Sequence, residues 1–277
     1  MKIGYIERVM VAVRDLAESR DKWRRAGFGI ASEQFDSGGL RIARIATGAV
    51  EIDLCALADD KPSGQPNGSL ADSMREAVER GGGIVGWIWG ATDDAKPAHM
   101  NHANWIALPG WSPAIVEAEL RTSGMPGVVT GVTDARLDLE SRRRRLVEIC
   151  GANPNTVDYL EHIVVMTPVL EDAIAANEAI GIPCKRIREV GNGARQAFFK
   201  LEQTVIEVVA PTNQRPGCWG LALMCDDIAR AVAVARENGL QATTPKLAIQ
   251  GGQIARIVEP LDGVAFAFMQ PGPRIDD

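Results

Sequence analysis

An internal repeat limits the folds that this chain of 277 residues can adopt. Residues 160–211 begin with a short apolar run typical of a buried strand, continue with an amphipathic helical pattern that ends at Gly181, and close with three strand patterns separated by turn residues. The same order returns in residues 6–57 and 218–269, where Asp-Leu or Asp-Ile precedes the helix. Three copies in one order predict tandem β-α-β-β-β modules.

A fourth copy is expected between residues 58 and 158, but its pattern is incomplete. Residues 75–94 read as a helix, a glycine turn and a strand, whereas the segment that follows is not a clean helix. Residues 114–124 then predict a helix and residues 127–132 a strand. The sequence therefore predicts an α+β fold of tandem βαβββ modules, of which the second is degenerate.

The modules divide into two predicted domains. Residues 1–150 hold modules one and two, and residues 151–277 hold modules three and four, with the boundary in the loop "GANPNT". The basic run "SRRRR" just before this boundary is interpreted as the solvated face of a helix.

Composition excludes several classes of partner. The net charge of −6 and the pI of about 5.3 argue against binding to nucleic acid or to anionic membranes. The first residues lack a long apolar run, so neither a signal peptide nor a membrane span is expected there. Five cysteines without CxxC spacing favour free thiols in a reducing compartment, and a cytoplasmic location is expected.

The β-α-β-β-β order resembles the vicinal-oxygen-chelate superfamily, which includes glyoxalase I, extradiol dioxygenases, methylmalonyl-CoA epimerase and the bleomycin-resistance proteins. The resemblance covers most of the chain and is clearest in residues 158–210. It implies that pairs of modules curl into open, barrel-like cups. In this superfamily the first and fourth strands of each module hold the metal ligands, so the same positions are candidates here.

In module three the resemblance places His162 at the first-strand position and Glu207 at the fourth-strand position. In module one the same positions hold Arg8 and Asp53, although a shift by two residues would choose Glu51.

In module four the corresponding residues are Gly220 and Phe266, which offer no ligand side chain. In module two the first-strand position is Gly86, and the fourth-strand position is not assigned.

A third metal ligand is expected only under one arrangement of the modules. If module two faces module three, His99 and His102 of "PAHMNHANW" could join His162 and Glu207. If module four faces module three, no third ligand is evident. Either one divalent ion (Zn, Mn, Ni, Co or Fe) or no metal is compatible with these positions.

Each candidate also has a structural interpretation. A histidine in an apolar strand commonly forms an ordinary hydrogen bond, and Glu207 could form an ion pair with Arg195. Arg8 and Asp53 could form a salt bridge inside the first cup. The substrate-binding candidates are Arg195 (or its neighbour Gln196), Trp87, Trp219, Phe266 and Arg8.

Three functions are considered. The preferred one is a glyoxalase-like isomerase, epimerase or lyase that enolises a small carbonyl or aromatic metabolite, with Glu207 as base and His162 as metal ligand or acid. The alternative is a metal-free ligand-binding protein of the bleomycin-resistance type. An extradiol dioxygenase is less favoured, because its second first-strand histidine would fall at Gly220. The expected partners are a small-molecule substrate and a second copy of the chain.

Overall fold

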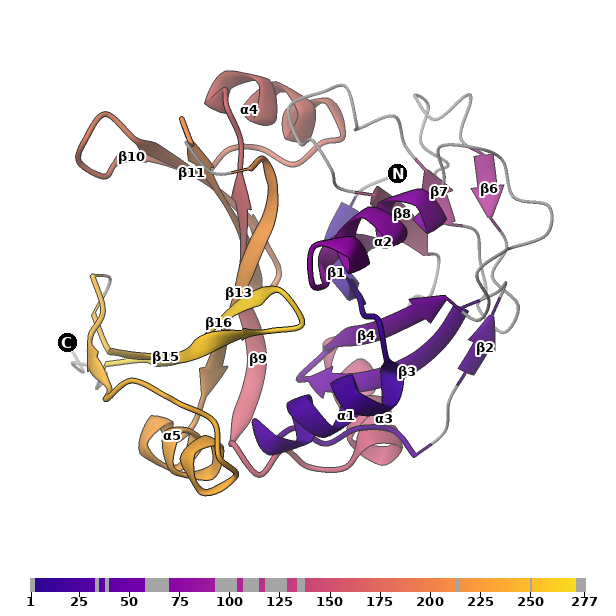
Figure 1. Ribbon diagram of the computed structural model, residues 1–277. Coiled ribbons are helices and arrows are strands. Elements are labelled where there is room, and N and C mark those ends of the chain that lie inside the picture. The colour runs from indigo at the N-terminus through magenta and orange to yellow at the C-terminus, as the bar shows by residue number, and fades with distance from the viewer. Residues whose placement is uncertain are drawn as a thin grey trace.

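The strands of the computed structural model form two large mixed sheets and one two-stranded sheet (Figure 1). The residues that the structure describes are 3–32, 35–37, 40–57, 70–92, 104–106, 115–117, 129–133, 138–212, 215–249 and 251–272.

The first sheet contains six strands in the order β2-β3-β4-β1-β5-β8. Their bounds are β1 Ile3–Ala12, β2 Phe35–Ser37, β3 Leu40–Thr47, β4 Val50–Leu57, β5 Gly83–Ala91 and β8 Val129–Thr133. The short strands β6 Asn104–Ile106 and β7 Ile115–Glu117 pair with each other. The helix predicted over residues 114–124 is therefore wrong at β7, and the predicted strand at 127–132 is confirmed by β8.

The second sheet contains eight strands in the order β10-β11-β12-β9-β13-β16-β15-β14. Their bounds are β9 Val157–Met166, β10 Arg186–Glu189, β11 Arg195–Leu201, β12 Thr204–Ala210, β13 Gly217–Cys225, β14 Lys246–Leu247, β15 Gln253–Leu261 and β16 Val264–Gln270. Figure 1 shows its outer strands bending to one side, away from the first sheet. The concave side of this sheet therefore faces away from the rest of the molecule.

Strand pairing shows how the modules combine. The first strand of each module lies parallel to its fourth strand, as in β1 with β4, β9 with β12 and β13 with β16. The first strands of consecutive modules pair antiparallel, β1 with β5 and β9 with β13. Module one thus pairs with module two, and module three with module four. The arrangement that would set module two against module three is wrong.

Three of the helices begin at aspartate caps. The helices are α1 Leu16–Arg25, α2 Leu70–Glu79, α3 Leu139–Cys150, α4 Leu170–Ala179 and α5 Ile228–Glu237. Asp15 accepts hydrogen bonds from the backbone of Ala17 and Glu18, and Asp227 accepts one from Arg230. The repeated Asp-Leu and Asp-Ile pairs of the sequence are thus helix starts. No helix in the described part of the chain has the length and apolar character needed to cross a membrane.

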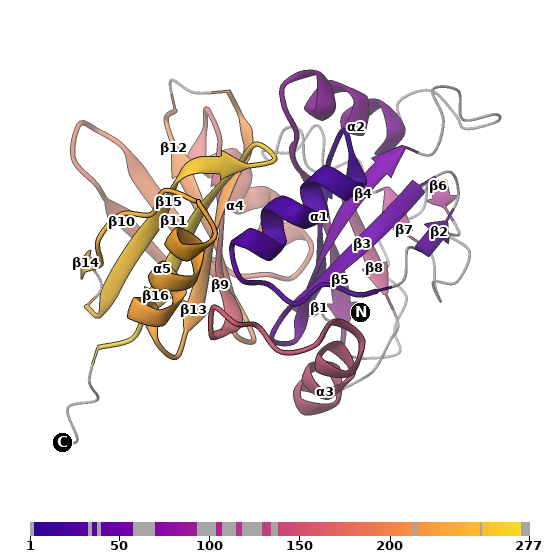
Figure 2. The same ribbon diagram turned by 60° about the horizontal axis from the view of Figure 1, so that its bottom comes forward.

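The main core lies between the two sheets. Trp23 of α1 packs against Phe266 of β16, with 6.0 Å between the ring centroids, and both are almost fully buried. Their cluster includes Trp87 and Trp89 of β5 and Ile163 of β9. Figure 2 shows the sheets side by side, with α1 on the first sheet and α5 on the second. Because Ile163 points into this core, its neighbour His162 lies on the opposite face of the second sheet.

Candidate functional site

Register places the two candidate ligands of module three on one face of the second sheet. His162 lies opposite Val205, and Glu207 lies opposite Val164 on the adjacent parallel strand. Residues that pair across strands point to the same face, as do residues two apart on one strand. His162 and Glu207 therefore share the face opposite Ile163 and the main core. We call this concave face the cup face.

The same register corrects one assignment in module four. Gly220 lies opposite Ala265, as His162 lies opposite Val205. The residue that corresponds to Glu207 is therefore Ala267, two positions further on, and not Phe266. Phe266 is one residue out of phase and points into the core, where its ring lies 5.6 Å from that of Phe28. The structure does not bring Phe266 together with the candidate site.

Gly220 is required by close packing. A Cβ atom added at this position would lie 2.4 Å from the carbonyl oxygen of Ala265, far closer than carbon and oxygen can approach. No side chain fits here without movement of β16. The two ligand positions of module four thus hold a forced glycine and an alanine, and neither supplies a donor.

In the first sheet, register confirms the choice of Asp53. Arg8 pairs with Glu51 and Met10 pairs with Asp53, which repeats the relationship of His162 with Val205 and Val164 with Glu207. In module two Gly86 pairs with Val129, so the fourth-strand position that the sequence left unassigned is Gly131, two residues after Val129.

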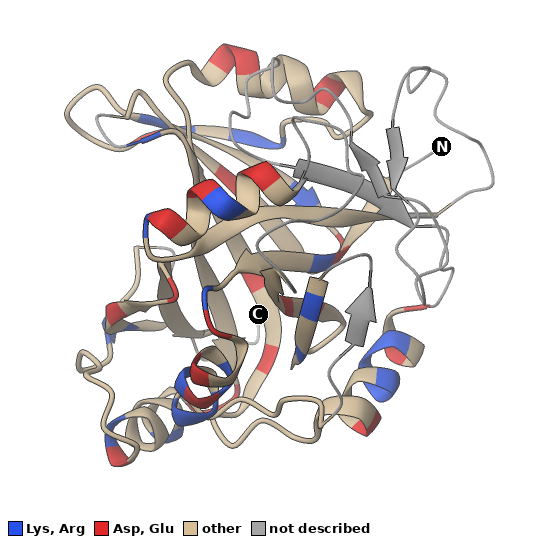
Figure 3. Cartoon of the chain, turned by 45° about the vertical axis from the view of Figure 1, so that its right-hand side comes forward, with Lys and Arg blue, Asp and Glu red and all other residues tan. Residues whose placement is uncertain are grey.

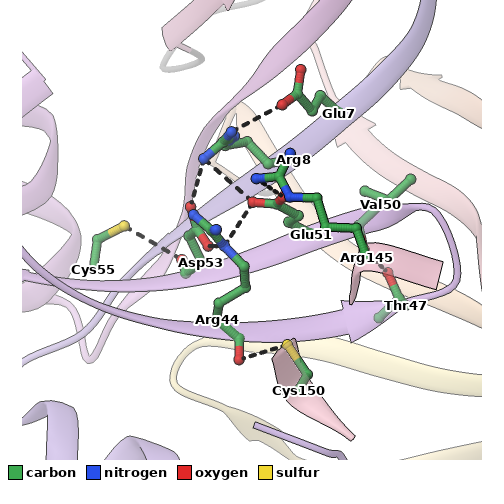
Figure 4. Close-up of polar contacts among 10 residues, drawn as sticks. All are labelled: Glu7, Arg8, Arg44, Thr47, Val50, Glu51, Asp53, Cys55, Arg145 and Cys150. Atoms are coloured by element: carbon green, nitrogen blue, oxygen red, sulfur yellow. Dashed lines mark hydrogen bonds and ion pairs between the residues drawn. The ribbon is translucent and has the colours of Figure 1, made fainter. Parts of the chain in front are cut away.

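A buried ion-pair network occupies the Arg8 face of the first sheet (Figure 4). Arg8 lies 3.4 Å from Asp53 and 3.3 Å from Glu51, while Arg44 Nε lies 2.7 Å from Glu51 and 3.1 Å from Asp53. Glu7 pairs with Arg8 as well. Burial lowers the pKa of Arg8, but the carboxylates of Glu51, Asp53 and Glu7 outweigh it, so the pKa is raised and the guanidinium stays charged. The salt bridge expected between Arg8 and Asp53 is present.

Helices cover this network. Met74 of α2 packs with Met10, which lies on the Arg8 face, and Leu146 of α3 packs with Ala46 on the same face. Arg8 itself is only 6% exposed. The substrate-binding role suggested for Arg8 therefore has no open surface among the described residues.

His162 on the cup face is buried and neutral. Burial, with a contribution from the Lys200 ammonium, lowers its pKa to about 4. Its Nδ1 contacts the Glu161 carboxylate, and a neutral ring that keeps its proton on Nδ1 would direct this proton towards the carboxylate. In that tautomer Nε2 is the unprotonated nitrogen, able to accept a hydrogen bond or a metal. A pKa this low does not favour His162 as a general acid.

Glu161 reaches His162 because of a β-bulge. Ala222 pairs with His162 and the next residue, Leu223, pairs with Leu160, so Glu161 is skipped in the register. Phe198 of β11 lies near the imidazole, with 6.4 Å between the ring centroids. Sequence reasoning missed Glu161 because a bulge leaves no mark in the apolar pattern. It missed Phe198 and Lys200 because their place beside Glu207 and His162 depends on the register of β11 and β12.

Glu207 is half-buried, and burial raises its pKa above the ordinary value against the opposing effects of Arg188 and Gln196. Gln196 donates a hydrogen bond from Nε2 to Glu207 Oε1. Arg195 instead lies on the other face and pairs with Glu171 of α4 at 2.5 Å. The structure therefore corrects the choice between these neighbours: Gln196 lies at the site, and Arg195 does not.

The tryptophan candidates lie in different places. Trp87 is fully buried in the main core, where its ring contacts Trp89 at a centroid distance of 5.3 Å, so it does not face the site. Trp219 is 41% exposed and is the residue skipped where Cys218 and Gly220 pair with consecutive residues of β9. It is adjacent to Gly220 in sequence, and its role stays a prediction.

The described part of the cup face offers few side chains that could bind a metal ion. A tightly held ion takes at least three protein ligands, and the cup face offers His162 and Glu207. Among the described residues, no three His, Cys, Asp or Glu side chains form a group that could hold a metal. His99 and His102 lie outside the described residues, so their part in a metal site stays a prediction. The described side chains therefore do not fit a resident ion.

No protein-family model and no curated protein sequence matches the chain. A mutant of 4-hydroxymandelate synthase from Streptomyces coelicolor is similar in structure, with a TM-score of 0.64 and 16% identity over 99% of this chain and 94% of that chain. A fusion of a xylose isomerase-like TIM barrel with 4-hydroxyphenylpyruvate dioxygenase gives a TM-score of 0.62 and 13% identity, over 100% of this chain and 50% of that one. Methylmalonyl-CoA epimerase from Mycobacterium tuberculosis matches 43% of this chain and 92% of its own, with 21% identity and a TM-score of 0.38.

The first two similarities extend over essentially the whole chain. They show that the chain has the fold of the vicinal-oxygen-chelate superfamily, as the repeat predicted. Identities of this size define a fold and leave the reaction open.

Proposed function

We propose that the chain is a glyoxalase-like enzyme that removes a proton from the carbon next to a carbonyl group, as in an isomerase, epimerase or lyase. The single observation that carries this proposal is Glu207, a half-buried carboxylate with a raised pKa on the cup face, oriented by Gln196. A carboxylate that holds its proton more strongly than usual is a better base towards a weakly acidic C–H bond.

Neighbouring side chains support the same chemistry. An enolate carries negative charge on oxygen, and fixed positive groups lower its energy in a partly dry site. Lys200 lies close enough to His162 to lower its pKa. We assign enolate stabilisation to Lys200 and assign the unprotonated Nε2 of His162 the role of accepting a hydrogen bond from the substrate.

The proposal is tested by exchange of α-protons with solvent. Enolisable ketones and 2-oxo acids are incubated with the protein in D2O, and loss of the α-proton signal is followed by NMR. Wild type should accelerate exchange for at least one compound class, and Glu207→Gln should slow it roughly 100-fold or more, because the base is removed. Glu189→Gln on β10 is the matched control. Glu189 is the cross-strand neighbour of Arg195, so its side chain points to the face opposite Glu207. Equal rates for wild type and Glu207→Gln would refute the assignment.

A metal-free binding protein is the second candidate. Gly220 and Ala267 carry no polar side chain at positions where ligand side chains are expected, and this leaves an apolar surface beside His162. Saturable binding of compounds whose α-protons never exchange would favour this candidate. A ring-cleaving dioxygenase is not proposed, because its second histidine would have to stand at Gly220. The homodimer and the cytoplasmic location remain predictions.

A further inference from the structure

The cup face carries an excess of positive charge. One row of paired residues runs Lys200, Val205, His162, Ala222, Ala267 and Arg256, and a second runs Arg186, Phe198, Glu207, Val164, Gly220 and Ala265. A third runs Arg188, Gln196, Val209 and Met166. These rows contain four cations (Lys200, Arg256, Arg186 and Arg188) and one carboxylate (Glu207), and Glu161 at the bulge adds a second carboxylate beside His162. This local balance contrasts with the net charge of −6 of the whole chain.

Three of these cations lack a carboxylate in contact. Within the described residues, no ion pair of 4.0 Å or less is found for Arg186, Arg188 or Arg256. Some other arginines of residues 151–277 do form ion pairs, such as Arg195 with Glu171 and Arg230 with Glu237. Figure 3 shows acidic and basic residues interspersed along the helices. The cup face therefore holds three arginines without an ion pair to the part of the chain that the structure describes.

Arg186 and Arg188 are the best placed of these groups. They lie two residues apart on β10, so their side chains point to the same face and their Cα atoms are about 7 Å apart. Arg188 acts electrostatically on Glu207, which shows that it lies near the proposed base. Two guanidinium forks at this spacing suit the oxygens of a carboxylate or phosphate.

We propose that the cup face binds an anionic carbonyl compound, whose carboxylate or phosphate group is held by Arg186 and Arg188. The apolar part of the compound lies over Phe198 and Val164, which share a row with Glu207. This inference rests on the proposed function for the carbonyl group and adds the charge of the substrate.

Arginines on an edge strand also have a simpler explanation. β10 is the outermost strand of its sheet, and charged side chains on such strands discourage pairing with other chains. That role requires no affinity for small anions, so binding measurements separate the two.

The probes are two fluorescent dyes that differ in one group. Anilinonaphthalene sulfonate has an aromatic body and an anionic sulfonate, and phenylnaphthylamine is the same fluorophore without the anion. The folded protein should bind the sulfonate dye saturably, and added salt should weaken this binding. Arg188→Gln and Arg186→Gln should each weaken it at least about threefold and leave the neutral dye unchanged. Arg230→Gln on α5 removes the same charge from an exposed helix and should change neither dye.

Displacement of the dye by benzoate or by inorganic phosphate identifies which anionic group is preferred. No saturable binding of the sulfonate dye, or binding that both cup-face variants leave unchanged, would overturn the proposal. The α-proton exchange assay is run on the same variants. Dye binding that depends on Arg188 without any exchange would uphold the anion site and refute the proposed reaction, so the two failures can be told apart.

Discussion

At the scale of single residues, burial acts in opposite senses on His162 and Glu207. It lowers the pKa of the imidazole and raises the pKa of the carboxyl, so each group is pushed towards its neutral form. Gln196 and Arg188 counteract this effect at Glu207. The pair thus combines an acceptor nitrogen on His162 with a carboxylate on Glu207 whose raised pKa makes it more basic than usual.

His162 should make the stability of the protein depend on pH. Its pKa falls from 6.5 in the unfolded chain to about 4 in the folded chain, so the unfolded chain binds the proton more readily. The contribution is present above pH 6.5 and is lost as the pH falls towards 4, by up to about 3 kcal/mol. Urea unfolding of wild type and His162→Gln at pH 7 and pH 4 measures it. The variant should lose less stability, and parallel losses in both proteins would contradict the neutral, buried imidazole.

At the scale of elements, two tight turns join the sheets. The turn before β5 contains Gly82, and the turn between β15 and β16 contains Asp262 and Gly263. A Cβ atom on Gly82 would lie 2.5 Å from the carbonyl oxygen of Asp262, and one on Gly263 would lie 2.6 Å from the carbonyl oxygen of Gly82. Asp262 also accepts a hydrogen bond from the Trp23 indole at 3.1 Å. The two turns are therefore in direct backbone contact, and a side chain at Gly82 or Gly263 would push them apart.

Gly82→Ala should test this contact against a matched neighbour. Gly81 and Gly82 both have positive φ, at +100° and +104°, but a Cβ on Gly81 would meet nothing within 4 Å. Both substitutions carry the same backbone strain, and only Gly82→Ala adds a collision. Its free energy of unfolding should fall by roughly 1–3 kcal/mol more than that of Gly81→Ala. Equal losses, measured by chemical denaturation, would mean that the turns are not in contact.

At the scale of the whole molecule, the two sheets use equivalent positions differently. In the first sheet these positions hold Arg8 and Asp53, which are closed over by helices and neutralised internally. In the second sheet they hold His162 and Glu207, and three nearby arginines (Arg186, Arg188 and Arg256) form no ion pair with any described residue. The equivalent positions of the first sheet therefore form a buried ion-pair network, and those of the second sheet form the proposed site.

Asp53→Asn should be strongly destabilising for this reason. The substitution leaves Arg8 and Arg44 buried with less negative charge beside them, which typically costs roughly 3–5 kcal/mol. Asp21→Asn makes the same change in an exposed pair with Arg24 and should have little effect. Thermal and urea unfolding of the two variants provide the comparison. A small loss for Asp53→Asn would show that the network is open to water.

Much of the fold could be predicted because the β-α-β-β-β order repeats along the chain. The salt bridge between Arg8 and Asp53 could be predicted as well, because the repeat places them at the first- and fourth-strand positions of module one. The fourth-strand position of module four could not be predicted reliably. In "VAFAFM" both faces of the strand are apolar, so alternation does not reveal which residue points to the cup face. The burial of Trp87 could not be predicted either, because it depends on how the two sheets pack. The bulge at Glu161 likewise arises from pairing between strands.

The most direct test of the account is a metal titration of wild type and Ala267→Glu. The cup face holds two ligand side chains, and register assigns the missing fourth-strand position to Ala267. Tag-free wild type should retain no stoichiometric Mn, Co or Zn after dialysis. Ala267→Glu should retain one ion, and adding His162→Ala should abolish this retention. A wild type that already holds one tightly bound ion, lost in His162→Ala, would contradict the claim that the site is incomplete.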